Sequence, residues 1–147
     1  MYEIARNSTV RMITDQLRLW APKVDYTEWD GHAENYKLPE KDLVGLLAFS
    51  CTENDRFHDL TFGIAIMTFN DPSLGRSTRY VNAFYNRLLG QSTYPIYSAN
   101  GTLAGFNAVV FDGTSVSPMQ RVDARPTVEI NVSARLTRVT EKLPQSA

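Results

Sequence analysis

The chain has 147 residues, of which 43% are hydrophobic and 21% charged, and its formal net charge is −1. This length and mixture are typical of one globular domain and exclude a collagen, a coiled coil and a wholly disordered chain. No apolar run reaches the roughly 18 residues of a membrane span, and the single cysteine, Cys51, excludes an internal disulfide and a cysteine-rich zinc site.

The charge is divided unevenly along the chain. Residues 1–60 hold 7 Lys and Arg against 11 Asp and Glu, a net charge of −4, whereas residues 61–147 hold 8 against 5, a net charge of +3. Such a polarity suits head-to-tail contacts between copies, although chance clustering of surface charge explains it as well. The first six residues lack the apolar segment of a secretory signal, so we expect folding in the cytoplasm.

An amphipathic helix is predicted near the N-terminus. Asn7, Ser8 and Thr9 can cap its first turn, and its apolar residues then recur at helical spacing: Val10, Ile13, Leu17 and Trp20. Pro22 ends the pattern. Residues 1–6 either extend the helix or lie outside it.

Residues 23–42 are expected to form an extended arm or loop. They hold three lysines and six acidic residues, and their few apolar side chains are mostly aromatic. A short strand fits Val24–Trp29. A connection of this length in a small domain is either functional or mobile. Its aromatic residues would either clasp a neighbouring subunit or cover the chain's own sheet.

A long β-hairpin is predicted at the centre of the chain. Leu43–Ser50 is an apolar run that fits a strand covered on both faces, and Leu60–Met67 alternates as a second strand. The polar residues 51–58 lie between them and are expected to form the loop.

This polar loop holds the residues that suggest chemistry. Cys51 and His58 are a conceivable nucleophile and base, and Glu53, Asp55 and Asp59 could join His58 as oxygen-rich metal ligands. The spacing fits no known metal signature, and a solvated loop explains the same residues.

A second helix is predicted after Asn70–Ser73. Asp71 is expected to cap it, with Pro72 as its first residue, and Gly90 to end it. Its arginines fit a solvated face, with a phosphate-binding stripe as the alternative: Arg76, Arg79 and Arg87.

Only strands are predicted beyond this helix. Tyr94–Ala99 and Leu103–Phe111 flank Asn100-Gly101, a two-residue turn in which both residues take positive φ. Residues 115–118 are expected to be loop. Residues 127–137 alternate strictly, which predicts a strand with one buried and one solvated face. Residues 140–147 form a polar tail.

Together these elements predict a single α+β domain over residues 1–147. We expect one mainly antiparallel β-sheet with two helices packed on it and a long β-hairpin. No P-loop, dinucleotide-binding, zinc-protease or serine-hydrolase motif occurs, and no cofactor is indicated. We therefore expect an interaction protein and not an enzyme.

The element order resembles the tail terminator, or tail completion, proteins of long-tailed bacteriophages, the lambda-type family. The resemblance covers residues 8–139. It rests on Asp15-Gln16-Leu17-Arg18 in the first helix, the tryptophan that follows, the polar hairpin and the closing strand Val128–Leu136. The arm at 23–42 and the hairpin at 94–111 have no match in the family pattern.

This resemblance implies a homo-oligomeric ring, a hexamer, that caps the tail tube protein, stops its polymerisation and offers a docking face to the head–tail connector protein. DNA would pass through the lumen without specific binding, and no membrane would be involved. The protein would be located in the virion tail or neck after assembly in the host cytoplasm. Another neck or head–tail joining role is the alternative of the same class. A small enzyme or ligand-binding domain that uses the Cys51–His58 loop is the alternative of a different class.

The residues expected to make contacts in such a ring are charged or aromatic and lie in the arm, the hairpin loop and the last strand: Trp29, Tyr36, Glu53, Asp55, Arg56, Glu129, Arg135 and Arg138. The aromatic pair would clasp a neighbour, because aromatic anchors carry much of the energy of an interface. The loop residues would reach the adjoining ring or tube, and those of the last strand would border the lumen. Ordinary solvent exposure is the alternative for each.

Overall fold

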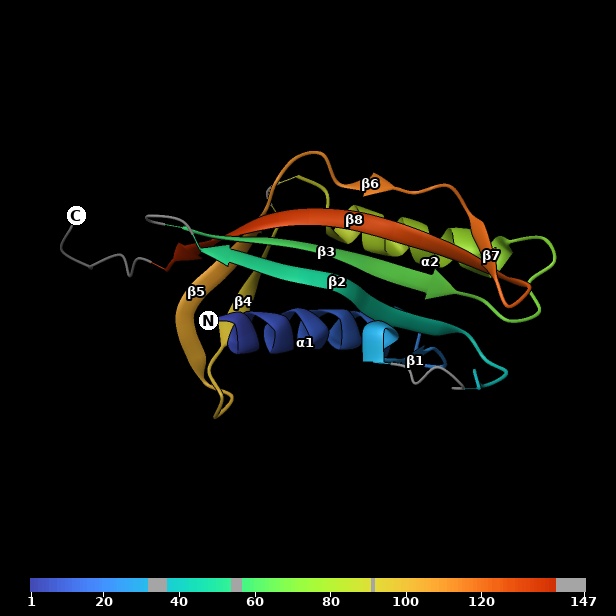
Figure 1. The fold of residues 1–147 in the computed structure, drawn as a ribbon, viewed down its shortest axis with the longest axis horizontal. Coiled ribbons are helices and arrows are strands. Elements are labelled where there is room, and N and C mark those ends of the chain that lie inside the picture. The colour runs from blue at the N-terminus through green and yellow to red at the C-terminus, as the bar shows by residue number, and fades with distance from the viewer. Residues whose placement is uncertain (32–36, 54–56, 91, 140–147) are drawn as a thin grey trace.

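A computed structural model describes residues 1–31, 37–53, 57–90 and 92–139. Two α-helices, a short 3-10 helix and eight strands follow one another in this order: α1 (Tyr2–Trp20), β1 (Asp25–Tyr26), η1 (Trp29–Gly31), β2 (Leu43–Glu53), β3 (His58–Met67), α2 (Gly75–Arg87), β4 (Thr93–Tyr97), β5 (Leu103–Val110), β6 (Ser115–Val116), β7 (Gln120–Val122) and β8 (Arg125–Arg138). The expected α+β architecture is confirmed. A single sheet, mostly antiparallel, carries both helices and is built around a long hairpin of β2 and β3 (Figure 1).

The long strand β8 organises the sheet. The strand order is β1-β2-β3-β8-β5-β4, and only the β1–β2 pair is parallel. Along one side β8 pairs with the whole of β3, from His58 opposite Leu136 to Met67 opposite Thr127. Along its other side it pairs in succession with β5, β6 and β7. The sheet therefore has different edge strands at its two ends.

One face of the sheet buries the core, and both helices lie on that face. Buried positions alternate along β8, as predicted for a half-buried strand, whereas β3 is buried on both faces from Phe62 to Met67. The inward side chains of both strands share one apolar cluster with residues of both helices. Trp20, at the end of α1, packs edge-on against Phe84 of α2 with ring centroids 4.8 Å apart. The two helices and the sheet thus form a single core.

A β-bulge interrupts β2. Leu47 lies opposite Gly63 and Ser50 opposite Thr61, so two residues of β2 face one residue of β3. Ala48 takes a φ of 52° there. The expectation of a strand covered on both faces holds for Leu43–Leu46 only, because from Leu47 onward half-buried positions alternate with exposed ones.

The first helix begins earlier than its capping residues suggested. It starts at Tyr2, and Ser8 and Thr9 are buried within it. The Ser8 hydroxyl accepts a hydrogen bond from the Tyr97 amide at 2.8 Å, and the Thr9 hydroxyl lies 2.9 Å from that of Tyr94. These hydroxyl groups were misassigned as caps because they bind β4, a partner distant in sequence.

The second helix begins later and ends earlier than predicted. It starts at Gly75, after Leu74 with a φ of 59°, and ends at Arg87. The Asp71 carboxylate still accepts the Ser77 amide, at 2.9 Å. Gly90 is not among the positive-φ glycines of the described residues. A Cβ there would lie 2.0 Å from Oδ1 of Asp112, so close packing explains this glycine.

The turn chemistry was predicted at the wrong hairpin. Residues 98–102 form a five-residue loop between β4 and β5, in which the Asn100 side chain accepts the Thr102 amide at 3.1 Å. The two-residue turn with positive φ at both positions connects β7 to β8 through Asp123 (50°) and Ala124 (62°). The region expected as loop at 115–118 contains β6, which pairs with β8.

Candidate assembly surfaces

The arm covers its own sheet at Trp29. This half-buried side chain lies over β2, with Cβ and Cε3 each 3.3 Å from where a Cβ on Gly45 would stand. Asp30 follows and accepts the amide of Ala48, at the bulge, at 2.6 Å. The arm's aromatic residues were expected either to clasp a neighbouring subunit or to cover the chain's own sheet. Trp29 covers the chain's own sheet. Tyr36 lies outside the described residues.

A second part of the arm is tied to α2 by Asp42. Its carboxylate accepts three hydrogen bonds: from the Phe69 amide at 2.8 Å, from Nε of Arg76 at 2.9 Å and from the Tyr80 hydroxyl at 3.2 Å. Arg76 therefore holds the arm, although the sequence indicated a solvated or phosphate-binding face. Arg87 likewise donates to the Thr93 carbonyl at 3.0 Å. Sequence reasoning missed this cluster because its members are 27 to 38 residues apart.

The last strand carries an arginine held between two aromatic rings. Arg135 lies directly opposite Asp59 of β3 and donates from Nε to Oδ1 at 2.8 Å. This hydrogen bond raises the pKa of Arg135 above its ordinary value. Its guanidinium also lies 4.4 Å from the ring centroid of Phe57 and 5.2 Å from that of Phe111. The cation is thus a fixed part of the hairpin end.

The three last-strand residues expected to border the lumen lie on two faces of β8. Glu129 and Arg135 are an even number of positions apart and share the outer face, where Glu129 lies beside Gly63. Arg138 lies on the opposite face, because β8 continues through it without a change of phase, and its guanidinium is 5.5 Å from the Phe106 ring. Glu129 and Arg135 therefore form the polar face predicted for the last strand, and Arg138 lies near it on the other face.

The hairpin end is shorter than the predicted loop. Cys51–Glu53 belongs to β2 and His58 to β3, with Glu53 opposite His58. Glu53 is exposed, and Phe57 is 41% exposed. Asp55 and Arg56 lie outside the described residues.

The Cys51–His58 pair is arranged diagonally across the hairpin. Cys51 lies opposite Leu60 and packs against the core, while His58 lies opposite Glu53. Burial raises the pKa of the Cys51 thiol, which disfavours the thiolate that a nucleophile needs. Within residues 1–31, 37–53, 57–90 and 92–139, no group of three or more His, Cys, Asp or Glu is placed to hold a metal ion. Nor does any helix in those ranges have the length and apolar character to cross a membrane.

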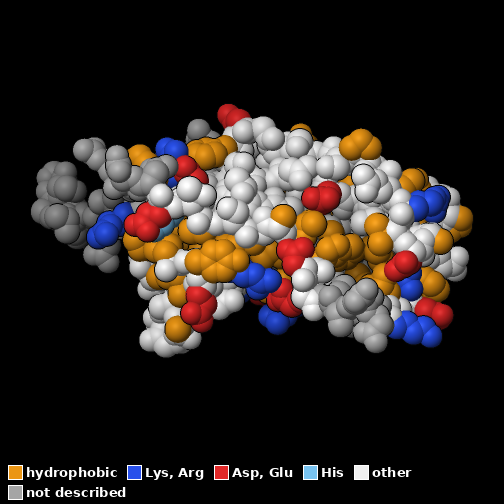
Figure 2. Space-filling view, in the orientation of Figure 1, with side chains coloured by type: hydrophobic (Ala, Val, Ile, Leu, Met, Phe, Trp, Pro, Cys, Tyr) orange, Lys and Arg blue, Asp and Glu red, His pale blue; other side chains and the backbone are white. Residues whose placement is uncertain are grey.

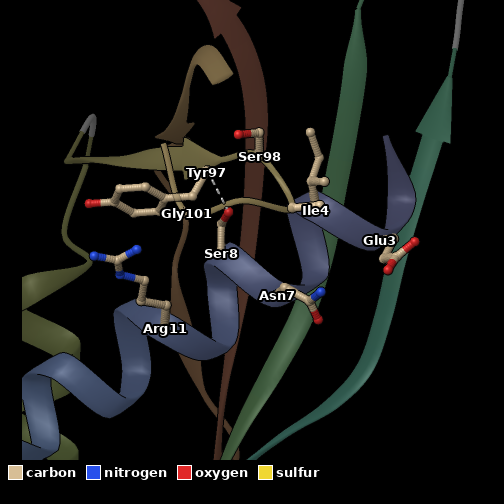
Figure 3. A pocket seen from close by; sticks show the side chains of 9 residues that line it. Glu3, Ile4, Asn7, Ser8, Arg11, Tyr97, Ser98 and Gly101 are labelled. Carbon is tan, nitrogen blue, oxygen red and sulfur yellow. Dashed lines mark hydrogen bonds between the residues drawn. The ribbon is translucent and has the colours of Figure 1, made fainter. Parts of the chain in front are cut away.

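A polar pocket lies between the start of α1 and the loop from β4 to β5. It has a volume of about 180 Å³ and includes Glu3, Asn7 and Arg11 of the helix. Figure 3 shows Ser8 pointing toward Tyr97, whose amide it accepts. The Arg11 guanidinium stacks 3.6 Å from the Tyr97 ring centroid. The hydrogen bond of Ser8 and the ring contact of Arg11, both to Tyr97, join α1 to β4.

An apolar groove lies between α2 and the chain that forms β6 and leads to β7. Its volume is about 380 Å³, and its lining residues are mainly apolar or small: Leu74, Ser77, Thr78, Val81, Asn82, Tyr85, Val116, Ser117, Met119 and Val128. Val116 is 41% exposed and Met119 39% exposed. Sequence analysis missed this surface because it assigned the segment to a loop.

Two stretches of backbone on opposite sides of the sheet, Phe49–Glu53 of β2 and Gln120–Val122 of β7, have no further partner strand among the described residues. β1 pairs with β2 only at Leu43 and Val44, and among the described strands only β3 pairs with Phe49–Glu53. On the other side β7 pairs with β8 alone, and all three of its residues are exposed. Figure 2 shows apolar side chains gathered along the boundary between β2 and α1. We call the two unpaired stretches of backbone the β2 edge (Phe49–Glu53) and the β7 edge (Gln120–Val122).

Comparison with known proteins identifies the fold and no function. No protein-family model matches the chain, and no curated protein matches its sequence. Three chains of solved structure match. One of them has a TM-score of 0.60 at 15% sequence identity, over 96% of this chain and 99% of that chain, and its name describes no function. The same α+β architecture therefore recurs in a protein of nearly the same length.

Proposed function

We propose that the protein is a ring-forming assembly protein of a long-tailed bacteriophage virion, with the role of a tail terminator. Copies of the chain would close into a ring on the end of the tail tube, stop its growth and offer the opposite side of the ring to the head–tail connector. The element order of the sequence and the single curved sheet with two helices support this proposal.

The observation that carries the proposal is the difference between the β2 edge and the β7 edge. The β2 edge belongs to the acidic part of the chain and ends at the exposed Glu53, whereas the β7 edge belongs to the basic part and carries the exposed Arg121. Two unlike surfaces on each copy favour head-to-tail association, which closes into a ring when the rotation between copies allows it.

The direct test combines the purified protein with the tail tube protein of the phage that carries it. We expect rings, either in solution or at tube ends by electron microscopy, and tubes that stop lengthening once the protein is added. Light scattering after size exclusion gives the mass of any ring in solution. A protein that stays monomeric at high concentration and leaves tube growth unchanged would contradict the proposal.

The alternatives give different results in the same experiments. A neck or head–tail joining protein would bind the connector and leave tube growth unaffected. For a small enzyme at the Cys51–His58 loop, C51A and H58A variants would fold normally and lose function. For the assembly protein we expect both variants to cap tubes as the parent does, because the Cys51 side chain packs against the core and contributes only its backbone to the β2 edge, and His58 belongs to neither edge.

A further inference from the structure

We infer that the β2 edge of one copy pairs with the β7 edge of the next, so that the ring is held together by a continuous intermolecular sheet. This inference rests on the proposed function and names the surfaces that would meet. The occupant of each edge is a second copy of this chain.

Two other stretches of sheet edge carry groups that oppose such pairing. At the start of β2, the Thr27 amide donates to the Val44 carbonyl at 2.9 Å, and Asp30 accepts the Ala48 amide. At β4, Pro95 has no N–H group, and the Tyr97 amide is taken by Ser8. Proline and side-chain bonds of this kind prevent edge-to-edge association. Phe49–Glu53 and Gln120–Val122 lack such protection among the described residues.

Rotational symmetry fixes the direction of the pairing. β2 is antiparallel to β3, β3 to β8 and β8 to β7, so β7 runs opposite to β2 within one copy. Copies related by rotation about a ring axis keep the same sense along that axis. The β2 edge of one copy therefore meets the β7 edge of the next as an antiparallel pair, which exchanges regular backbone hydrogen bonds.

The charges on the two edges agree with this direction. Glu53 and Arg121 both lie on the helix-bearing face, because Glu53 faces His58 and Arg121 faces Pro126 across their ladders. In an antiparallel pair, opposite charges at diagonal positions are within reach of one another.

The offset between the edges suits a closed ring. In the register of the sheet, Cys51 aligns with Leu60 and Ala134, whereas Arg121 aligns with Pro126. The two edges are thus about eight residues, or about 26 Å, apart along β8. A stagger between neighbours tilts the strands relative to the axis, and closure of a sheet on itself requires such a tilt.

Disulfide trapping tests the pairing. In a C51S background, T52C is combined with Q120C in one protein and with V122C in another. All three positions are exposed. Both pairs are needed because a register shift of two residues decides whether Gln120 or Val122 lies opposite Thr52. After mild oxidation of rings, in solution or on tubes, we expect one combination to give a ladder of covalent multimers on a non-reducing gel. The controls are T52C alone and T52C with T93C on the closed β4 edge, both of which should stay monomeric.

A charge-exchange series gives a second readout that needs no cysteine. E53R and R121E should each raise the subunit concentration for half-assembly about tenfold, and the double variant E53R/R121E should restore it. R18E, a reversal at an exposed residue in the last turn of α1, should have no such effect.

The outcomes separate this inference from the proposed function. Rings of normal mass that give no ladder with either cysteine pair, or a double variant no better than its parents, would overturn the edge pairing and leave the ring intact. Covalent dimers from T52C alone would show that β2 meets β2, which also overturns it. Absence of rings both in solution and on tubes would overturn the proposed function itself.

Discussion

The guanidinium of Arg76, in the first turn of α2, donates to both carboxylate oxygens of Asp42, over 2.9 Å from Nε and 3.3 Å from Nη2. The same carboxylate accepts the Phe69 amide, which follows β3. One acidic side chain at the end of the arm thereby joins the arm, the sheet and the helix. Such charge-assisted, two-pronged bonds add geometric specificity as well as energy.

Removing this link should loosen the arm and α2 together. We expect R76A to lower the free energy of unfolding by about 2 kcal/mol, because it leaves the mostly buried Asp42 carboxylate without its charged donor. R76K should fall between the parent and R76A, since a lysine cannot bind both carboxylate oxygens in the same way. Urea unfolding followed by circular dichroism measures the change, and equal midpoints for all three proteins would contradict this account.

A side chain at Gly45 should displace the arm from the sheet. A Cβ there would lie 2.3 Å from the Thr27 carbonyl oxygen and 3.3 Å from Trp29, and backbone atoms cannot yield cheaply. We expect G45A to destabilise the protein by about 2 kcal/mol and to speed hydrogen exchange over residues 25–31. G75A is the matched control, because its nearest neighbour would lie at an ordinary 3.6 Å. Unchanged exchange in G45A would show that the arm does not depend on this contact.

Stability at acid pH should depend on Asp71. Burial raises the pKa of this carboxyl, but the hydrogen bonds from the Ser77 and Arg76 amides outweigh that effect and hold it below its ordinary value. Its contribution is therefore present above the unfolded value of about 3.9 and is lost as the pH falls through the lower folded value. We expect D71N to be less stable than the parent by about 1 kcal/mol at pH 7.

This difference should shrink as the pH falls below about 4. Urea unfolding at pH 7, 5, 3.5 and 2.5 measures it, with E40Q as a variant at an exposed acidic residue. A difference between D71N and the parent that stays constant over this range would contradict the assignment of a lowered pKa to Asp71.

Stability at alkaline pH should depend on Tyr26. Burial raises the pKa of its phenol to about 12, above the unfolded value of about 10. The neutral phenol thus contributes stability that is fully present below pH 10 and is lost as the pH rises toward 12. Y26F should lose less stability over this range than the parent, whereas Y2F, at an exposed position, should follow the parent. The same slope for all three in urea unfolding would exclude the effect.

The elements with a strong local pattern were predictable from the sequence. The hairpin of β2 and β3, the strand β8 and the existence of both helices follow from periodicity, which reflects the buried face of each element. The predicted helix boundaries were wrong where a side chain could form either a helix cap or a contact with a distant strand. Ser8 and Thr9 have cap-forming hydroxyl groups, but those groups bind β4, a choice that only the tertiary structure determines.

The surfaces proposed for assembly could be predicted less well. Glu53 was expected at the hairpin end and lies there, exposed. The β7 edge was missed because Ala124 is an unfavourable residue for a turn with positive φ, so nothing in the sequence marked the turn before β8. Whether an edge is open depends on which strands pair, and long-range pairing leaves no local signal in a single sequence.

The bulge at Ala48 gives β2 one residue more than the strand beside it, and a strand with such an excess must bend away from its neighbour. Inward-facing side chains continue on both sides of the extra residue, since Leu46 before it and Phe49 and Cys51 after it all pack toward the core. Deleting Ala48 would therefore keep the hydrophobic pattern and remove the bend. In the proposed assembly the bend sets the direction in which the β2 edge meets its neighbour, so a chain without Ala48 would present that edge at a different angle.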